Sequence, residues 1–140
     1  MTVSRPDDVT RLYLTLGRIN RALRRDARNA PIGHGALSAL ATLAASEPIR
    51  LGELADLEGV SAASMSRIIA SLEKLGMVRR EADPEDRRAF LVEPTSDGRR
   101  VVEAGRAARM QALAARLEKL SREERDDLRR ALPALEALVG

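Results

Sequence analysis

The chain has 140 residues and a formal net charge of +3, and it contains one histidine, one tyrosine, one phenylalanine and no cysteine. This length corresponds to a single domain over residues 1–140, and the modest charge means that any basic surface must be local. The absence of cysteine excludes disulfides and cysteine-ligated zinc. A single histidine argues against a histidine-based metal site or a hydrolytic triad. The small number of aromatic residues argues against stacking on single-stranded nucleic acid.

Arginine dominates the basic residues, because Lys74 and Lys119 are the only lysines among 24 basic side chains. The rigid guanidinium fork suits phosphate and guanine, although a GC-rich genome would produce the same bias. The N-terminus reaches Asp7 and Asp8 without an apolar segment, and the longest nearly apolar run, residues 36–45, is about half of a membrane span. We therefore expect a cytoplasmic protein without membrane contact.

In chain order, apolar residues at alternating spacings of three and four predict a first helix over residues 8–29. A proline and a glycine then break the pattern, and a second, short helix is expected over residues 35–45. A brief extended segment follows at residues 49–50.

Two helices over residues 51–58 and 61–75 come next, with Gly76 in the place where glycine ends a helix. Short apolar runs over residues 77–82 and 89–93 predict the two strands of a hairpin.

Two more helices complete the chain. The first covers residues 97–120 after a cap that starts at Thr95, and the second, to residue 139, opens with a capping box of Ser121 and Glu124. Pro133 is expected to interrupt the last helix. The expected fold is therefore mainly α with a small β-hairpin wing, in which helical segments flank a winged helix-turn-helix core over residues 32–95.

The segment from residue 51 to 67 carries the signals of a helix-turn-helix. Ala55 is small enough for two helices to cross closely, and Gly59, four residues later, tolerates the positive φ of a tight turn. Ser61 and Arg67 lie in the first turns of the second helix, the end that enters the major groove in DNA-binding proteins. An ordinary helical hairpin capped by Ser61 explains this segment equally well.

The following residues favour DNA binding over the helical hairpin. Residues 61–80 contain four basic side chains and one acidic one, and the expected hairpin tip presents Asp86, Arg87 and Arg88. Arginine in a wing loop suits the negative potential of a narrow minor groove. Asp86 is expected to hold the Arg88 guanidinium by a charge-assisted hydrogen bond.

Four consecutive blocks then form a specific pattern. They are Ser61-x-x-Ser-x-Ser-Arg67, Leu72-Glu-Lys-Leu-Gly-Met-Val-Arg79, Asp83-Pro-Glu-Asp-Arg-Arg-Ala89 and Val92-Glu-Pro-Thr-Ser-Asp-Gly98. This pattern resembles the MarR family of bacterial transcriptional regulators, and the resemblance is continuous over residues 51–98. The chain departs from the family at Pro94, where a leucine is common and where the hairpin is expected to end early, and at the flexible segment 32–35.

The resemblance implies a homodimer that binds a pseudo-palindromic operator in double-stranded DNA, usually as a repressor. It places the DNA contacts in the recognition helix and the wing. These residues are Ser61, Ala62, Ser64, Ser66, Arg67, Arg79, Asp86, Arg87 and Arg88.

The outer helices carry more apolar residues than a small winged helix could cover, which indicates an interface. We expect the segments 7–29 and 97–139 to form a helical dimerisation region around a two-fold axis, the alternative being a bundle within a monomer. The expected interface residues are Val9, Leu12, Leu16, Ile19, Leu117, Leu120, Leu128, Leu132 and Leu135.

Many members of the resembled family release DNA when a small, often phenolic, molecule binds between the dimer helices and the winged helix. Tyr13, Leu16, His34 and Met77 are the candidate contacts for such an effector. The alternative to effector binding is a structural role, in which His34 is a loop or interface residue and Met77 is a core residue. No metal or other cofactor is expected, and a thiol switch is excluded.

Two other classes of function stay open on the residues alone. The first is a helical protein that binds another protein, which insensitivity of binding to salt and heparin would reveal. The second is an enzyme, but its acid and base groups would have to converge, whereas the carboxylates here lie mostly beside arginine, as at Glu123 and Asp126.

Overall fold

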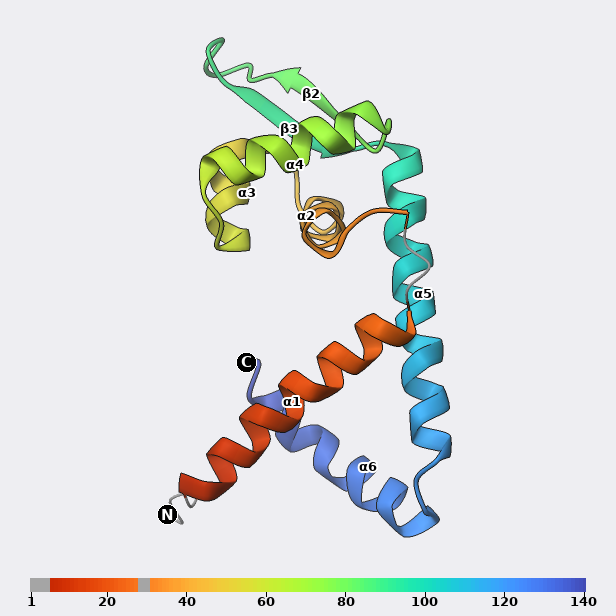
Figure 1. The fold of residues 1–140 in the computed structure, drawn as a ribbon. Helices are drawn as coiled ribbons and strands as arrows, with labels where there is room; N and C mark the ends of the chain where they lie inside the picture. Colours follow the sequence, from red (N-terminus) through yellow and green to blue (C-terminus); the bar gives the residue numbers. More distant parts are fainter. Residues whose placement is uncertain (1–5, 28–30) are drawn as a thin grey trace. The chain divides into compact units, whose positions relative to one another are not determined.

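The computed structural model describes residues 6–27 and 31–140, and within these ranges it has six helices and one three-stranded sheet (Figure 1). The helices are α1 (Pro6–Asp26), α2 (His34–Ala44), α3 (Leu51–Glu58), α4 (Ala62–Lys74), α5 (Ser96–Glu118) and α6 (Arg122–Ala137). The strands are β1 (Ile49–Arg50), β2 (Val78–Ala82) and β3 (Phe90–Pro94). The predicted mainly α fold with a β-hairpin wing is confirmed. The expected end of the first helix, at residues 28–29, lies outside the described residues.

The chain divides into two compact units, and α5 contributes to both. One unit comprises residues 29–107 and contains the winged helix-turn-helix; the other comprises residues 1–28 and 108–140 and contains α1, the second part of α5 and α6. The boundary falls inside α5 because Val101 and Val102, in its first part, pack against the core of the winged helix-turn-helix.

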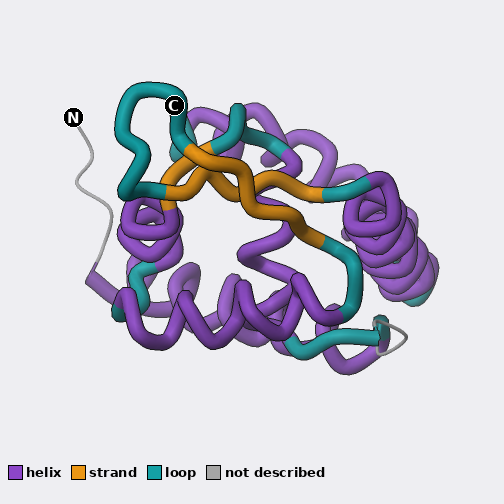
Figure 2. The backbone as a smooth tube through the Cα atoms, turned by 90° about the horizontal axis from the view of Figure 1, so that it is seen from above, coloured by secondary structure: helices purple, strands orange, loops and turns teal. Residues whose placement is uncertain are grey.

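The sheet, drawn in orange in Figure 2, is antiparallel, and β3 lies between β1 and β2. Val78 pairs with Pro94 and Ala82 with Phe90, so the expectation that Pro94 ends the hairpin early is wrong. Successive N–H groups point to opposite sides of a strand, and the N–H of Thr95 donates to the Met77 carbonyl on the β2 side. The nitrogen of Pro94 therefore faces the β1 side, where β1 pairs only with Leu91 and Val92, and proline loses no ladder hydrogen bond.

The core of the winged helix-turn-helix forms where α2, α3, α4 and β3 bring their apolar faces together. The most deeply buried large side chains include Leu40, Leu54, Ile69 and Val92, one from each of these elements. Ala55 is also buried, and Gly59 has φ 67°, so both predictions for the helix-turn-helix are confirmed. The Val60 N–H donates to the Ala55 carbonyl over 3.1 Å, which closes the turn before α4.

Two predictions for helix ends are confirmed, and one for a helix interior is wrong. Gly76 has φ 72° after the end of α4, and the capping box of Ser121 and Glu124 is present with both hydrogen bonds. Helix α6, however, continues through Pro133 to Ala137. The proline ring removes one backbone hydrogen bond, and the helical hydrogen bonds on either side of it remain.

Helix α5 starts very close to the end of α4. Thr95 caps it, because its hydroxyl oxygen accepts the Gly98 N–H at 3.1 Å and donates to the Gly76 carbonyl at 2.6 Å. A Cβ atom on Gly98 would lie 2.1 Å from the Met77 carbonyl oxygen, so no other residue fits without a shift of backbone. No helix within the described ranges is long and apolar enough to span a membrane.

Replacing Gly98 by alanine tests this close approach. Gly98→Ala should lower the free energy of unfolding by about 2 kcal/mol, because the new methyl group meets backbone rather than a flexible side chain. Gly52→Ala, at an exposed position of α3 with no atom within 4 Å of the added Cβ, is the matched control and should keep or slightly raise stability. Urea denaturation at one protein concentration measures both, and equal stability of the two variants would contradict the prediction.

Candidate nucleic-acid interface

The first turn of α4 is closed by two serines. The Ser61 hydroxyl oxygen accepts the Ser64 backbone N–H at 3.1 Å, and the two serine hydroxyls lie 3.0 Å apart in a hydrogen bond. Ser61 is therefore the N-cap of α4, and its position before the helix favours this role. Both predicted site residues are present at the start of the recognition helix, but their hydroxyls are engaged with each other and with the helix end.

One face of α4 is buried and the opposite face is exposed. Met65, Ile69 and Leu72 point into the core. The exposed residues on the other side follow helical spacing and span about 180° of the helix circumference at 3.6 residues per turn. They are Ala62, Ala63, Ser66, Arg67, Ala70, Ser71, Glu73 and Lys74. Up to Ser71 these exposed side chains are small apart from Arg67, and this is the part of α4 that a DNA groove could receive.

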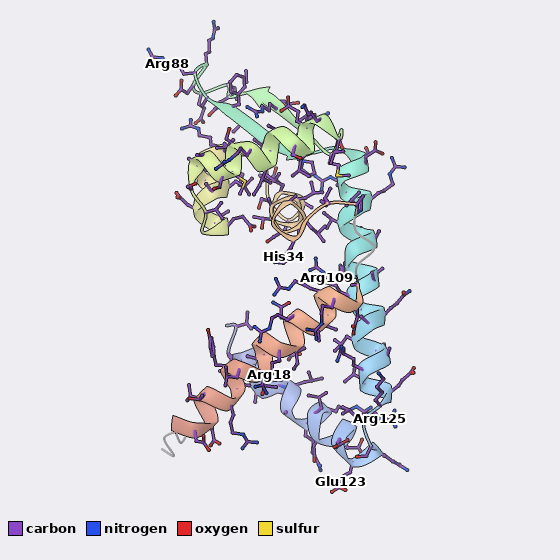
Figure 3. The ribbon with its side chains drawn as sticks, viewed as in Figure 1. Arg18, His34, Arg88, Arg109, Glu123 and Arg125 are labelled. Atoms are coloured by element: carbon purple, nitrogen blue, oxygen red, sulfur yellow. The ribbon has the colours of Figure 1, made fainter. Side chains whose placement is uncertain are left out.

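The wing is the loop between β2 and β3, and it ends in two arginines. Arg87 and Arg88 are both exposed, and Figure 3 shows Arg88 pointing away from the rest of its unit. Asp86 accepts the backbone N–H of Arg88 at 3.0 Å, and its own carbonyl accepts the Ala89 N–H at 3.0 Å. The expectation that Asp86 holds the Arg88 guanidinium is wrong, because a carboxylate two residues upstream reaches the backbone of a turn first. Asp86 shapes the loop instead.

The arginines of this unit divide into paired and unpaired groups. Arg79 on β2 hydrogen-bonds to Glu93, its partner across the strands, and the Arg80 Nε donates to Glu73 of α4 over 2.6 Å. Within the described part of the chain, four cations of the α4 and wing region have no ion pair. These are Arg67, Lys74, Arg87 and Arg88. The local basic excess seen in the sequence is thus located on the exposed face of α4, at the end of α4 and at the wing tip.

An ion pair with a buried carboxylate, which local sequence did not predict, joins the wing to α3. Asp83, directly after β2, is 5% exposed and is the one charged residue that is buried within the described ranges, whereas the Arg50 side chain is 43% exposed. Oδ1 of Asp83 accepts the Glu85 backbone N–H at 2.9 Å, and Oδ2 accepts the Arg50 Nε–H at 2.8 Å and lies 2.7 Å from the Arg50 Nη2. The Glu85 hydrogen bond first, and the Arg50 hydrogen bond second, hold the pKa of Asp83 below its usual value.

The position of this ion pair suggests its structural role. Arg50 is the N-cap residue of α3 and belongs to β1, whereas Asp83 opens the wing loop. The charge-assisted hydrogen bond between them fixes the base of the wing to the helix-turn-helix. The Asp-Pro sequence at 83–84 predicted only a turn, and its partner 33 residues upstream left no local signal.

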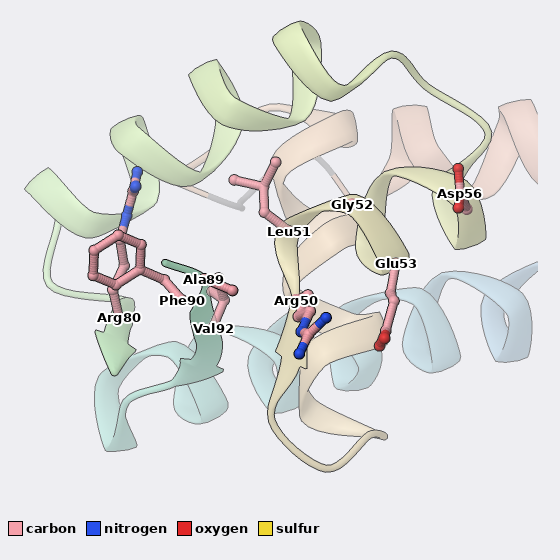
Figure 4. Close-up of a pocket in the computed structure, with 9 residues that line it drawn as sticks. All are labelled: Arg50, Leu51, Gly52, Glu53, Asp56, Arg80, Ala89, Phe90 and Val92. Atoms are coloured by element: carbon pink, nitrogen blue, oxygen red, sulfur yellow. The ribbon is translucent and has the colours of Figure 1, made fainter. Parts of the chain in front are cut away.

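A cavity of about 500 Å³ lies between the first turn of α3 and the sheet (Figure 4). Leu51, Phe90 and Val92 provide apolar lining. Two arginines also line it, but Arg50 is bound by Asp83 and Arg80 by Glu73. The cavity therefore offers no unpaired cation to an acidic ligand.

The four candidate effector contacts are distributed over both units. Tyr13, 75% exposed, and Leu16 line a depression of about 300 Å³ on α1. His34 is exposed at the first residue of α2, and Met77, 8% exposed, belongs to the core of the winged helix-turn-helix. The described residues contain no group of three or more side chains that could hold a metal ion.

The helical unit leaves its apolar residues largely uncovered. Among its described residues only Ala22 is buried. Of the predicted interface residues, five are exposed, namely Val9, Leu12, Leu16, Ile19 and Leu132, and four are half-buried, namely Leu117, Leu120, Leu128 and Leu135. Within this unit an ion pair of 2.7 Å between Asp26 and Arg116 connects α1 with α5.

Comparison with known proteins agrees with this geometry. A family model described as MarR family matches residues 33–90. An uncharacterised HTH-type transcriptional regulator of Mycobacterium bovis is 43% identical over 128 residues, which cover 91% of this chain and 90% of the relative. A putative transcriptional regulator from Pseudomonas aeruginosa has a TM-score of 0.80 and 28% identity, with 96% of this chain and 97% of that chain covered.

A likeness of fold alone extends to a variant of S. aureus MepR bound to an oligodeoxyribonucleotide. Its TM-score is 0.70 at 17% identity, and the match covers 94% of this chain and 98% of that chain.

The ion pair at the wing base predicts how Asp83 titrates. Its folded-state pKa lies below the value of about 3.9 for an unfolded aspartate, so the ionised carboxylate stabilises the fold at neutral pH. This contribution is lost as the pH falls through the folded-state pKa. The carboxyl ¹³C shift of Asp83 should titrate below that of an unfolded reference peptide, and Arg50→Gln should move the midpoint upward. A midpoint that stays the same in Arg50→Gln would contradict the pairing.

Proposed function

Because the chain belongs to the MarR family of winged helix-turn-helix, DNA-binding transcriptional regulators, we propose that it represses transcription as a homodimer on a pseudo-palindromic operator in double-stranded DNA. One observation carries this proposal most. The exposed face of α4 and the wing tip, two separate elements of the same compact unit, present the unpaired guanidinium groups of Arg67, Arg87 and Arg88. Unpaired arginine is the group that DNA phosphates and guanine bind best.

In the proposed complex, α4 lies in the major groove and the wing in an adjacent minor groove. Short side chains on α4 allow close approach to base edges, and Arg67 reaches guanine or phosphate from the same face. Arg87 and Arg88 enter the minor groove, where the potential is most negative when the groove is narrow. Release of counterions by these arginines supplies much of the affinity and makes it depend on salt. The oligonucleotide-bound MepR structure supports the compatibility of this fold with DNA.

The homodimer in this proposal is supported by the helical unit. A single chain leaves Val9 59% exposed, and Leu16 and Leu132 are also exposed. A second copy that packs its own α1 and α6 around a two-fold axis would remove these side chains from water. Two recognition helices related by that axis would read half-sites about 34 Å apart, one turn of DNA.

We extend the proposal to an effector of small aromatic or phenolic character that releases the operator. The depression on α1 beside Tyr13 and Leu16 supports a site there, because it combines an aromatic ring with aliphatic lining. A mobility-shift assay with added phenolic acids tests this effector site, because an effector should release the bound operator.

Removing the wing guanidinium should weaken DNA binding without affecting the fold. Arg88→Ala should lower operator affinity at least tenfold and reduce its salt dependence, because a minor-groove cation is lost. Arg100→Ala is the matched control, since Arg100 is exposed on α5 and paired with Asp97. Mobility shifts at two salt concentrations, with heparin as competitor, measure the effect. Equal affinity of wild type and Arg88→Ala would refute the role of the wing.

The interface predicts a dimer in solution. Sedimentation velocity at micromolar concentration should give the mass of two chains, and Leu16→Asp should give that of one, because a carboxylate would be buried in the apolar interface. Asp7→Asn, on the same helix at an exposed acidic position, should stay dimeric. A monomeric wild type would sink the homodimer proposal.

A further inference from the structure

We propose that Ala63 and Ala70 of α4 contact thymine methyl groups in the half-site, with guanine as the base that faces Arg67. The inference rests on the proposed function, because it requires α4 to lie in the major groove. It specifies the chemistry of the DNA that the site accepts.

The composition of the exposed α4 face is the first support. Three of its eight exposed residues are alanines, namely Ala62, Ala63 and Ala70. Ala63 and Ala70, seven residues apart, lie on the side of the helix away from the buried Met65 and Ile69, whereas Ala62 lies at the edge of that side. Whatever binds the outward side of α4 therefore meets two alanine methyl groups two turns apart, with Arg67 between them along the helix.

The hydrogen bonds of α4 are the second support, because they occupy the polar groups of Ser61, Ser64 and Glu73. The hydroxyls of Ser61 and Ser64 bond to each other and close the first turn. Glu73, the acidic residue on the exposed side, is bound to Arg80 over 2.6 Å and is not free to accept from the amino group of cytosine. On the exposed face, the described residues with free hydrogen-bonding groups are Ser66, Arg67 and, in the C-terminal part of the helix, Ser71 and Lys74.

The chemistry of base edges then selects the bases. In the major groove the C5 methyl of thymine is the apolar group on a base edge, and alanine is a side chain suited to contact it. An alanine pressed against an amino or carbonyl edge would leave that group without its hydrogen bond, which is costly once water is excluded. Arg67 can bind the O6 and N7 atoms of guanine with both arms of its guanidinium. The half-site should therefore combine thymines facing the alanines with one guanine.

Selection of bound sites from randomised duplex DNA, using the full chain, provides the operator. The enriched sequence should contain two half-sites, each with thymines next to a guanine. Replacing one thymidine at a time by deoxyuridine then removes only the methyl group. Each contacted thymine should lose about threefold in affinity, whereas thymines outside the half-sites should show no change.

A coupling measurement assigns each methyl to its alanine. Ala63→Ser and Ala70→Ser keep the size of the side chain and replace apolar by polar surface, so each should abolish the deoxyuridine effect at one position and leave the others. Ala104→Ser, at an exposed position of α5, is the matched control and should retain the full profile.

The outcomes separate this inference from the proposed function. Failure to enrich any duplex sequence would overturn both. An enriched operator whose half-sites lack thymine, or whose affinity is unchanged by deoxyuridine at every position, would overturn the thymine reading and leave the regulator standing.

Discussion

Met65, Ile69 and Leu72 are buried against α2, α3 and the sheet, and this burial decides which side of α4 faces outward. The helix cannot rotate about its axis without exposing these side chains to water, at a cost of about 1.5 kcal/mol or more for each. The core on the opposite side of α4 therefore determines which residues lie on the exposed face that is proposed to bind DNA. The close approach of Gly98 to the Met77 carbonyl secures the same packing at the end of the helix, where α5 begins.

Electrostatic pairing separates the arginines that hold the structure from those that are free to bind. Arg50 forms an ion pair with the buried carboxylate of Asp83, and Arg80 forms one with Glu73. Both pairs therefore stabilise the junction between the wing and the helix-turn-helix. Arg67 and Arg88 have no ion pair in the described part of the chain. A modest net charge of +3 is compatible with a DNA-binding surface, because Arg67 and Arg88 place unpaired positive charge at the proposed contacts.

The two compact units differ in how they cover their apolar residues. The winged helix-turn-helix buries its core within one chain, whereas the helical unit leaves residues such as Val9 and Leu132 in contact with water. Exposed apolar helices of this kind mark an interface, and in the proposed homodimer a second copy would provide matching helices. Binding of two half-sites and burial of the helical unit would then follow from the same assembly.

Features determined within a few residues of sequence were predictable. The helical periodicity, the positive φ of Gly59 and Gly76, and the capping box at Ser121 each depend on neighbours three to five positions away. Together with the wing signature, they were enough to predict the fold, the recognition helix and the wing tip. The unbroken course of α6 through Pro133 and the strand position of Pro94 were not predicted, since both depend on which backbone groups find partners elsewhere.

Partner choice between distant charges was decided only by the tertiary structure. Asp83 finds Arg50 across 33 residues, whereas Asp86, expected to bind a guanidinium, binds the backbone of its own turn. With 21 acidic and 24 basic side chains, local sequence leaves many pairings open, and Coulomb attraction between surface charges is too weak to select among them. Packing of the core brings Arg50 and Asp83 together and buries the carboxylate, and only then does the interaction become specific. The sequence by itself determined which elements form and where the basic residues lie, and the fold decided which of them remain free.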